Sequence, residues 1–412
     1  MSLTSKNTSD AEVLDKESIV DIKKSRLKKS LLQDLYVRGN RTIAQLTREL
    51  HTSVPSVTVL LEELMDEHWI VEIGTADAQF GRKPILYSLH PKGRYTMLLD
   101  VTTYGSKAII LNLQNQILFK IDLHLSLEDN ISHLAKLAES FHYVLAESGI
   151  SASDLIAIGI SMPGLINPKN GFNYSYRKLN PDKQSLVEWL EKELDLPVYI
   201  INDTQATILG EHQFGLAKGM ENVLSVNMDW GGVGLGIVLN GKVFQGASGF
   251  AGELGHIQVK EDGELCYCGK VGCLDTLTSA SSLIRRIKER IRLGQVSKLT
   301  ENNFEEIDIE MVIDAANRGD ALAIDLLHDI GKEMGKGLSI AVHLFNPEAI
   351  IINGVLAKAG RFISNPIEQA IYKYCLADFK NDLIINVSQL GENARLLGTH
   401  VYVVDQVLEK VS

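Results

Sequence analysis

The chain of 412 residues is too long for one ordinary hydrophobic core and suits two or three domains. Hydrophobic residues make up 45% and charged residues 23%, as in a soluble globular protein. This composition excludes a membrane-spanning protein, because no run of about eighteen apolar residues occurs. Residues 1–21 are polar and lack the apolar core of a secretory signal. We therefore expect a flexible lead-in and a cytoplasmic protein.

The net charge of −11 is unevenly distributed. Residues 22–95 hold 12 Lys and Arg against 8 Asp and Glu, whereas residues 96–412 hold 27 against 39. A basic front end on an acidic body is expected when one small domain binds phosphates.

The front end reads as three helices and a hairpin. Leucines recur at helical spacing over residues 25–37, and Gly39 ends that helix. Thr42 and Ser53 are typical N-cap residues for two further helices. Strands are expected over 69–73 and 85–89, on either side of a polar turn. This order predicts a winged helix-turn-helix DNA-binding domain over residues 22–90.

In such a domain the third helix enters the major groove and the wing reaches the minor groove. Val59, at a position where many winged helices have arginine, offers only a methyl contact to thymine. A protein-interaction module without a DNA partner is the alternative. The predicted DNA-binding residues are Ser53, Pro55, Ser56, Thr58, Arg82 and Lys83.

Residues 91–95 are expected to link this domain to an α/β body. Three strands over 95–123, a helix near 126–147 and a buried strand over 155–161 follow in order. This order is typical of actin-like sugar kinases.

Two segments carry a specific motif. Residues 246–256 read Gly-Ala-Ser-Gly-Phe-Ala-Gly-Glu-Leu-Gly-His, and residues 266–275 read Cys-Tyr-Cys-Gly-Lys-Val-Gly-Cys-Leu-Asp. They resemble the signature of the ROK family (repressors, open reading frames and kinases). The resemblance implies a two-lobed sugar-kinase-like domain over 96–412, with a hinge near residue 200, behind an N-terminal winged helix.

The clustered thiols indicate a metal site. His256, Cys266, Cys268 and Cys273 provide the four ligands of a closed tetrahedral Zn²⁺ shell, with no open position for a catalytic water. Reduced cysteines in a loop core are the alternative. The resemblance implies that the zinc is structural and holds the sugar-binding loop.

Sugar hydroxyls both donate and accept hydrogen bonds, so carboxylates and amides suit them. Asn202 and Asp203 follow a strand and match the family's Asn-Asp pair, in which Asp is the catalytic base of the kinases. Glu253 and His256 match the next two sugar contacts. Asp275, the fifth predicted sugar-binding residue, stands where the family usually has Glu, which leaves the identity of the sugar open.

Three segments, 100–104, 230–234 and 352–354, correspond to the nucleotide-binding loops of the family's kinases but depart from their sequence pattern. Thr102, Tyr104 and Trp230 are among the residues that differ. We therefore expect no catalytic residue, with Asp203 at a vestigial base position. The chain is predicted to be a sugar-responsive DNA-binding regulator, a repressor of carbohydrate-utilisation genes that binds operator DNA and a sugar or sugar phosphate. A homodimer or dimer of dimers is expected. The alternatives are an ATP-dependent sugar kinase with an added domain, and a scaffold with vestigial sites.

Overall fold

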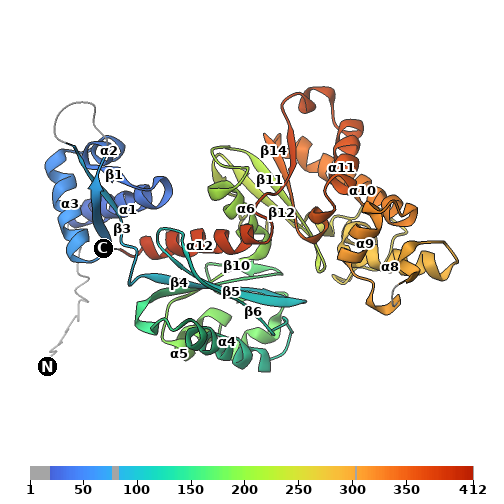
Figure 1. Ribbon diagram of the computed structural model, residues 1–412, viewed down its shortest axis with the longest axis horizontal. Coiled ribbons are helices and arrows are strands. Elements are labelled where there is room, and N and C mark those ends of the chain that lie inside the picture. The colour runs from blue at the N-terminus through green and yellow to red at the C-terminus, as the bar shows by residue number, and fades with distance from the viewer. Residues whose placement is uncertain (1–18, 77–82, 302–303, 412) are drawn as a thin grey trace, which may run out of the picture. The chain divides into compact units, whose positions relative to one another are not determined.

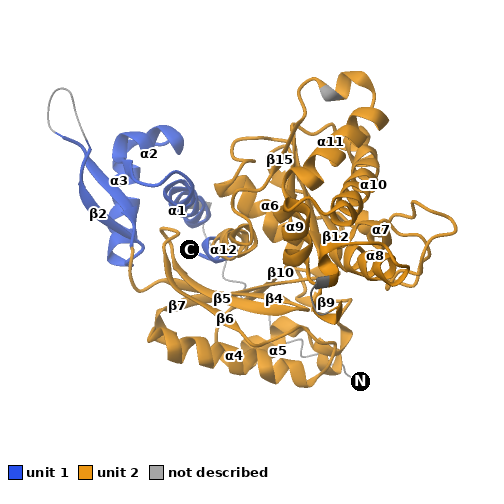
Figure 2. Ribbon diagram, turned by 45° about the vertical axis from the view of Figure 1, so that its right-hand side comes forward, with its two compact units in different colours: residues 1–90, 406–412 blue, residues 91–405 orange. Residues whose placement is uncertain are grey.

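The computed structural model describes residues 19–76, 83–301 and 304–411 (Figure 1). The chain divides into two compact units (Figure 2). One contains residues 1–90 together with 406–412, and the other contains residues 91–405. No helix in the described ranges is long and apolar enough to cross a membrane.

The N-terminal unit consists of three helices and a small antiparallel sheet in the order β1-β3-β2. The Thr42 side chain accepts from Gln45 N, and Gln45 Oε1 accepts from Thr42 N, which forms a capping box. Ser53 accepts from Ser56 N and caps the next helix. The elements are α1 (Ile19–Arg38), β1 (Arg41–Thr42), α2 (Ile43–Glu49), α3 (Val54–Asp66), β2 (Ile70–Thr75) and β3 (Ile85–Leu89).

The first helix begins at Ile19, six residues before the expected start. Asp21 in its first turn suits the positive end of the helix dipole and favours the longer helix. The core of the unit contains the leucines predicted from helical spacing, among them Leu31, Leu46 and Leu61, which are almost fully buried. The capped helix pair α2–α3 is thus held on α1 by apolar contacts.

The second unit contains two five-stranded sheets built on one scheme. In each sheet three antiparallel strands are followed by two parallel ones, in the orders β6-β5-β4-β7-β10 and β13-β12-β11-β14-β15. The first contains β4 (Tyr95–Thr102), β5 (Gly105–Asn112), β6 (Ile117–Leu123), β7 (Leu155–Met162) and β10 (Val198–Asn202). The second contains β11 (Val223–Asp229), β12 (Gly232–Leu239), β13 (Lys242–Val243), β14 (Ala349–Asn353) and β15 (Ile384–Val387). A short hairpin pairs β8 (Ile166–Asn167) with β9 (Phe172–Asn173).

Helices cover both sheets. Figure 2 shows α4 (Ser132–Ser148) and α5 (Leu186–Leu194) below the first sheet, with α12 (Asn393–Leu408) on its other face. On the second sheet α6 (Asp203–Phe214) packs on one face. The opposite face meets a large apolar core to which further helices contribute. These are α8 (Ala280–Arg292), α9 (Ile309–Asn317), α10 (Ala321–Phe345) and α11 (Arg361–Tyr374). The short helix α7 (Asp275–Thr278) lies against α8 and α10.

The helix expected from residue 126 begins only at Ser132. Leu125 and Leu127 are buried, and Leu127 N donates to Thr102 O at 2.7 Å, so this segment runs extended beside β4. The apolar spacing that indicated an earlier helix start belongs to this extended segment.

Helices α6 and α12 cross with their backbones in contact. A Cβ on Gly398 of α12 would lie 1.7 Å from Ala206 O, and one on Gly210 of α6 would lie 1.9 Å from Ala394 O. Only glycine permits so close an approach at both positions. The two helices therefore form a fixed pair.

Candidate functional site

The predicted Asn-Asp pair lies at the start of α6. Asn202 Oδ1 accepts from Thr204 N and Gln205 N, and Asn202 Nδ2 donates to Gly164 O at 3.1 Å. Asn202 is thus the N-cap of α6, and one amide hydrogen remains for a ligand. Asp203 follows with Oδ1 bound to Thr204 N at 2.8 Å.

Glu253 and His256 are placed by the glycine-rich segment 246–256, which ends in a turn of 3₁₀ helix, Leu254–His256. Gln205 of α6 donates to Gly249 O at 2.8 Å and joins this segment to α6. Burial and then the charges of Asp203 and Asp275 raise the pKa of Glu253 to about 7. The predicted sugar carboxylates therefore belong to one electrostatic cluster.

Asp275, at the start of α7, lies behind His256. Its Oδ1 accepts from Val233 N at 2.7 Å, and its Oδ2 is 3.6 Å from His256 Nδ1. The side chain is 5% exposed, and burial raises its pKa to about 6. The carboxylate is thus held beside the imidazole by its hydrogen bond from Val233 N.

The four predicted metal ligands converge. The ligand atoms of His256, Cys266, Cys268 and Cys273 all lie within 4.8 Å of one another. Sγ of Cys268 and Sγ of Cys273 are 3.7 Å apart, close to the edge of about 3.8 Å for a tetrahedron with Zn–S bonds of about 2.3 Å. His256 Nδ1 is 3.7 Å from Cys266 Sγ. The donor set and spacing fit Zn²⁺.

A tight loop brings the thiols together. Cys266 N donates to Lys270 O, and Gly269 N donates back to Cys266 O. Gly272 has φ +75°, and a Cβ there would lie 1.6 Å from Lys260 O. Only glycine therefore fits at this position of the loop that carries the thiols.

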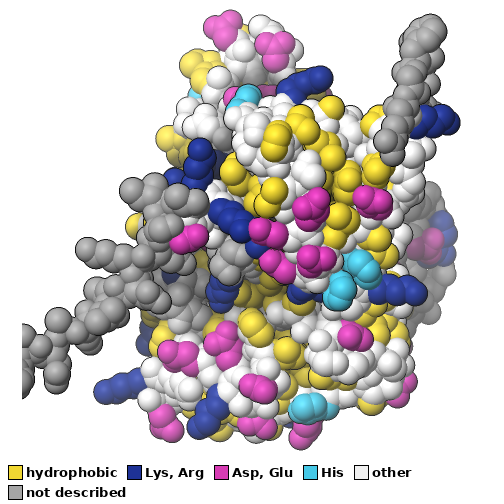
Figure 3. Space-filling model, turned by 90° about the vertical axis from the view of Figure 1, so that its left-hand side faces the viewer, with side chains coloured by type: hydrophobic (Ala, Val, Ile, Leu, Met, Phe, Trp, Pro, Cys, Tyr) yellow, Lys and Arg dark blue, Asp and Glu magenta, His cyan; other side chains and the backbone are white. Residues whose placement is uncertain are grey.

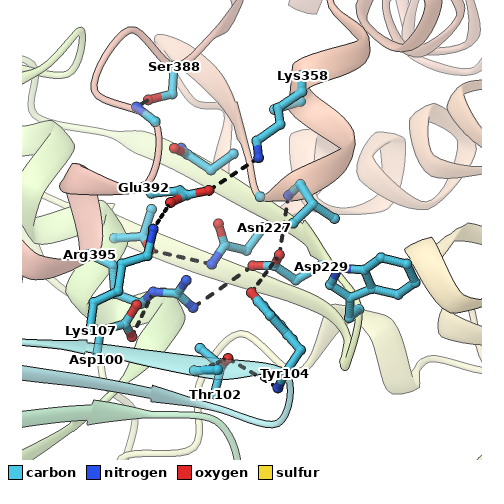
Figure 4. Close-up of a pocket in the computed structure, with 18 of the residues that line it drawn as sticks. Asp100, Thr102, Tyr104, Lys107, Asn227, Asp229, Lys358, Ser388, Glu392 and Arg395 are labelled. Atoms are coloured by element: carbon cyan, nitrogen blue, oxygen red, sulfur yellow. Dashed lines mark hydrogen bonds and ion pairs between the residues drawn. The ribbon is translucent and has the colours of Figure 1, made fainter. Parts of the chain in front are cut away.

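A separate cavity of about 490 Å³ lies beside Asp100 and contains the altered phosphate-loop residues (Figure 4). Tyr104 OH reaches across it and donates to Asp229 Oδ1 at 3.2 Å. Five acidic and three basic side chains line it. Its acidic side chains are Asp100, Asp122, Asp229, Glu310 and Glu392, and its basic ones are Lys107, Lys358 and Arg395.

Arg395, which the sequence interpretation missed, lies between three carboxylates. Its Nε is 3.0 Å from Asp100 Oδ1, and its Nη1 is 3.9 Å from Asp229 Oδ2 (Figure 4). The same Nη1 is 3.6 Å from Asp203 Oδ2. Burial raises the pKa of Asp203 and of Asp100, an effect that Arg395 opposes. No local motif marks this arginine, because its partners lie about 170 to 300 residues earlier in the chain.

The predicted DNA-binding residues of α3 are largely at the surface. Ser53, Pro55 and Ser56 are exposed and Thr58 is half-buried. Ser53 Oγ and Ser56 Oγ are 2.9 Å apart and serve the helix cap. Lys83 is exposed, and Arg82 lies outside the described residues.

Much of the basic charge of this unit is neutralised internally. Lys28 pairs with Glu63 and Glu67, and Arg41 pairs with Asp34. Figure 3 likewise shows acidic side chains interspersed with Lys and Arg on one face of the molecule. The ion pairs of Lys28 and Arg41 therefore reduce the net positive charge of this unit.

The duplicated sheets, the glycine-rich segment and the His-Cys cluster define a two-lobed protein of the sugar-kinase type. Residues 105–406 match the ROK family, and the chain belongs to it. It is 27% identical to the DNA-binding transcriptional dual regulator NagC of Escherichia coli (strain K12), over 85% of this chain and 86% of that protein. It is also 27% identical to the xylose repressor of Bacillus spizizenii, over 93% of this chain and 96% of the repressor.

Solved structures show the same relationship. A ROK family transcriptional regulator, a homologue of the E. coli MLC protein, superposes with a TM-score of 0.80 at 28% identity over 94% of this chain and 97% of its own. A ROK family glucokinase from Streptomyces griseus, in complex with glucose and AMPPNP, gives 0.64 at 25% identity over 75% and 98%.

Proposed function

We propose that this protein is a sugar-responsive DNA-binding transcriptional regulator, a repressor whose kinase-like unit binds a sugar or sugar phosphate without phosphorylating it. One observation carries the proposal. The xylose repressor is matched over 93% of this chain, whereas the glucokinase is matched over 75%. The additional part of the chain is of the size of the N-terminal helical unit, which a kinase does not need.

The proposed sugar site comprises Asp203, Glu253 and His256, with the remaining amide hydrogen of Asn202. The carboxylates accept hydrogen bonds from sugar hydroxyls, while the imidazole and amide donate. Asp275 lies beside this site: its Oδ1 accepts from Val233 N, and its Oδ2 is 3.6 Å from His256 Nδ1.

The proposed zinc links two sites through one imidazole. Nδ1 of His256 faces Cys266, whereas Nε2 lies 3.7 Å from Glu253 Oε2. A metal on Nδ1 would fix the ring, and Nε2–H would then face both Tyr267 Oη, 3.1 Å away, and the sugar site. When bound, Zn²⁺ would supply rigidity, because four protein ligands leave no position for a reacting water.

Phosphoryl transfer depends on positioning and neutralising phosphate charge. The cavity beside Asp100 opposes both, because acidic side chains outnumber basic ones and the Tyr104 side chain reaches across it. Asp203 could still accept a proton from a sugar hydroxyl, so the altered phosphate loops, and not this residue, distinguish a sensor from a kinase.

Isothermal titration of monosaccharides and their phosphates, including xylose, N-acetylglucosamine and glucose, tests the sugar site. We expect heat from one sugar, and a loss of affinity of at least about tenfold in Asp203→Asn, since a buried sugar hydroxyl loses a charged acceptor. Asp325→Asn, on the exposed face of α10, is the matched control and should bind as wild type.

An ADP-release assay with ATP and Mg²⁺ distinguishes the regulator from a kinase. We expect no sugar-dependent ADP above background. Sugar-dependent ADP that disappears in Asp203→Asn would establish the kinase instead, and no heat from any sugar would remove the sensor.

For DNA, we propose that α3 enters the major groove and that Arg82 and Lys83 on the wing contact the minor groove. Val54 and Val59 of α3 are half exposed, at 52% and 50%, and suit contact with thymine methyl groups. Two such units in a homodimer would meet two half-sites.

A further inference from the structure

Arg395 occupies the first turn of α12, and its side chain is only 10% exposed. Its three acidic partners come from different elements: Asp100 from β4, Asp203 from the start of α6, and Asp229 from the end of β11. A guanidinium remains charged under all ordinary conditions. It therefore provides a permanent positive charge where two sheets and two helices meet.

Asp203 connects this charge to the proposed sugar site. Its Oδ1 accepts from Thr204 N, so Oδ2 is the oxygen that faces Arg395 Nη1, 3.6 Å away. A sugar hydroxyl that donates to Asp203 would compete with Arg395 for the charge of that carboxylate. Water cannot replace the weakened attraction between Asp203 and Arg395, because both side chains are largely buried.

The helix that carries Arg395 does not end in the same unit. α12 runs from Asn393 to Leu408, whereas residues 406–412 group with residues 1–90. Within that N-terminal unit, Leu408 is buried and Glu409 pairs with Lys29 of α1 at 2.7 Å. One continuous helix thus carries Arg395 in its first turn and ends among the residues of the proposed DNA-binding unit.

The start of α12 is also fixed to the helix that bears Asp203, through the glycine crossing at Gly210 and Gly398. Thr96 Oγ1 of β4 lies 2.8 Å from His400 Nδ1, which holds the middle of α12. A rearrangement around Asp203 would therefore shift α12 as a whole.

We propose that Arg395 is the residue through which occupation of the sugar site is transmitted to the DNA-binding unit, by way of α12. This inference rests on the proposed function. Arg395 acts as a positioning residue: it attracts Asp203 and does not bind DNA. Sugar binding at Asp203 weakens this attraction, which helps to fix the position of α12. Coupling of this kind is a difference in DNA affinity between the sugar-free and the sugar-bound protein.

Arg395→Gln tests the proposal, because it keeps most of the side-chain length and removes the charge. The dissociation constant for fluorescein-labelled DNA from the region upstream of the protein's own gene is measured by anisotropy, with and without the sugar identified by titration. We expect the two constants to differ at least about fivefold in wild type. In Arg395→Gln the ratio should fall to within about twofold of one, while DNA binding and sugar binding both persist.

Two variants complete the design. Arg395→Lys retains the charge and should recover part of the ratio. Arg286→Gln makes the same exchange in α8. This arginine pairs with Asp329 at 2.9 Å and is not among the partners of Asp100, Asp203 or Asp229. The variant should keep the wild-type ratio.

A second measurement needs no variant. Hydrogen exchange of wild-type protein, with and without sugar, should show changed protection over 395–405 of α12. A wild-type ratio in Arg395→Gln, or unchanged exchange in α12, would overturn this inference and leave the sugar-responsive regulator standing. An absence of any sugar effect on DNA binding in wild type would overturn both.

Discussion

Replacement of Gly398 by alanine probes the crossing of α6 and α12. An alanine Cβ would lie 1.7 Å from Ala206 O and 2.6 Å from Gly210 N, both of them backbone atoms of α6. Ordinary van der Waals contact begins at about 3.4 Å, so the helices would have to separate by more than an ångström. Backbone atoms within a helix cannot turn aside as a side chain can.

The magnitude follows from two opposing effects. Alanine favours a helix over glycine by about 1 kcal/mol. Overpacking costs about 1–3 kcal/mol, and more where the neighbour is rigid. The expected result is a net loss of about 2 kcal/mol in the free energy of unfolding.

Thermal unfolding followed by circular dichroism measures this loss. At about 2–4 °C per kcal/mol, the midpoint should fall by about 5 °C. Gly337→Ala in α10 is the matched control, because the nearest atoms to its Cβ would all belong to the Leu274 side chain, with Cδ2 at 2.5 Å and Cδ1 at 3.2 Å. That side chain can adjust, so the control should remain within about 2 °C of wild type. A Gly398→Ala protein at least as stable as wild type would show that α6 and α12 are not in backbone contact.

Three further predictions concern the metal, the DNA and α12. Elemental analysis of protein purified without added metal should find about one zinc per chain; Cys268→Ser should lower that content and the unfolding midpoint, whereas the control Cys375→Ser, away from the cluster, should retain the metal. Operator affinity should fall steeply as salt rises, because phosphate contacts release counterions, and Arg82→Ala should weaken it without changing sugar affinity; a salt-independent interaction would favour a protein partner instead. Burial lowers the pKa of His400 to about 3, so the unfolded chain takes up a proton below about pH 6.5 that the folded chain does not. Stability should therefore decline from pH 6.5 toward pH 3, by about 2 kcal/mol from this group at pH 5, and His400→Gln should flatten that decline; equal slopes would contradict it.

Local signals in the sequence determined much of the fold. Thr42 and Ser53 cap helices as predicted, because a cap depends on residues only three positions away. The strands of the first sheet follow the predicted apolar runs. The convergence of His256 with Cys266, Cys268 and Cys273 was also expected, since three of the four ligands fall within eight residues of one another.

Tertiary structure alone decided the rest. The start of α4 shifts to Ser132 because Leu127 bonds to Thr102 of a distant strand. Asp275 faces His256 and Val233 N, an orientation that its motif does not encode. Arg395 meets Asp100 across 295 residues of chain, and no spacing rule links residues so far apart. Caps and metal loops are set by short stretches of backbone, whereas the balance of buried charges is set only when distant strands and helices pack together.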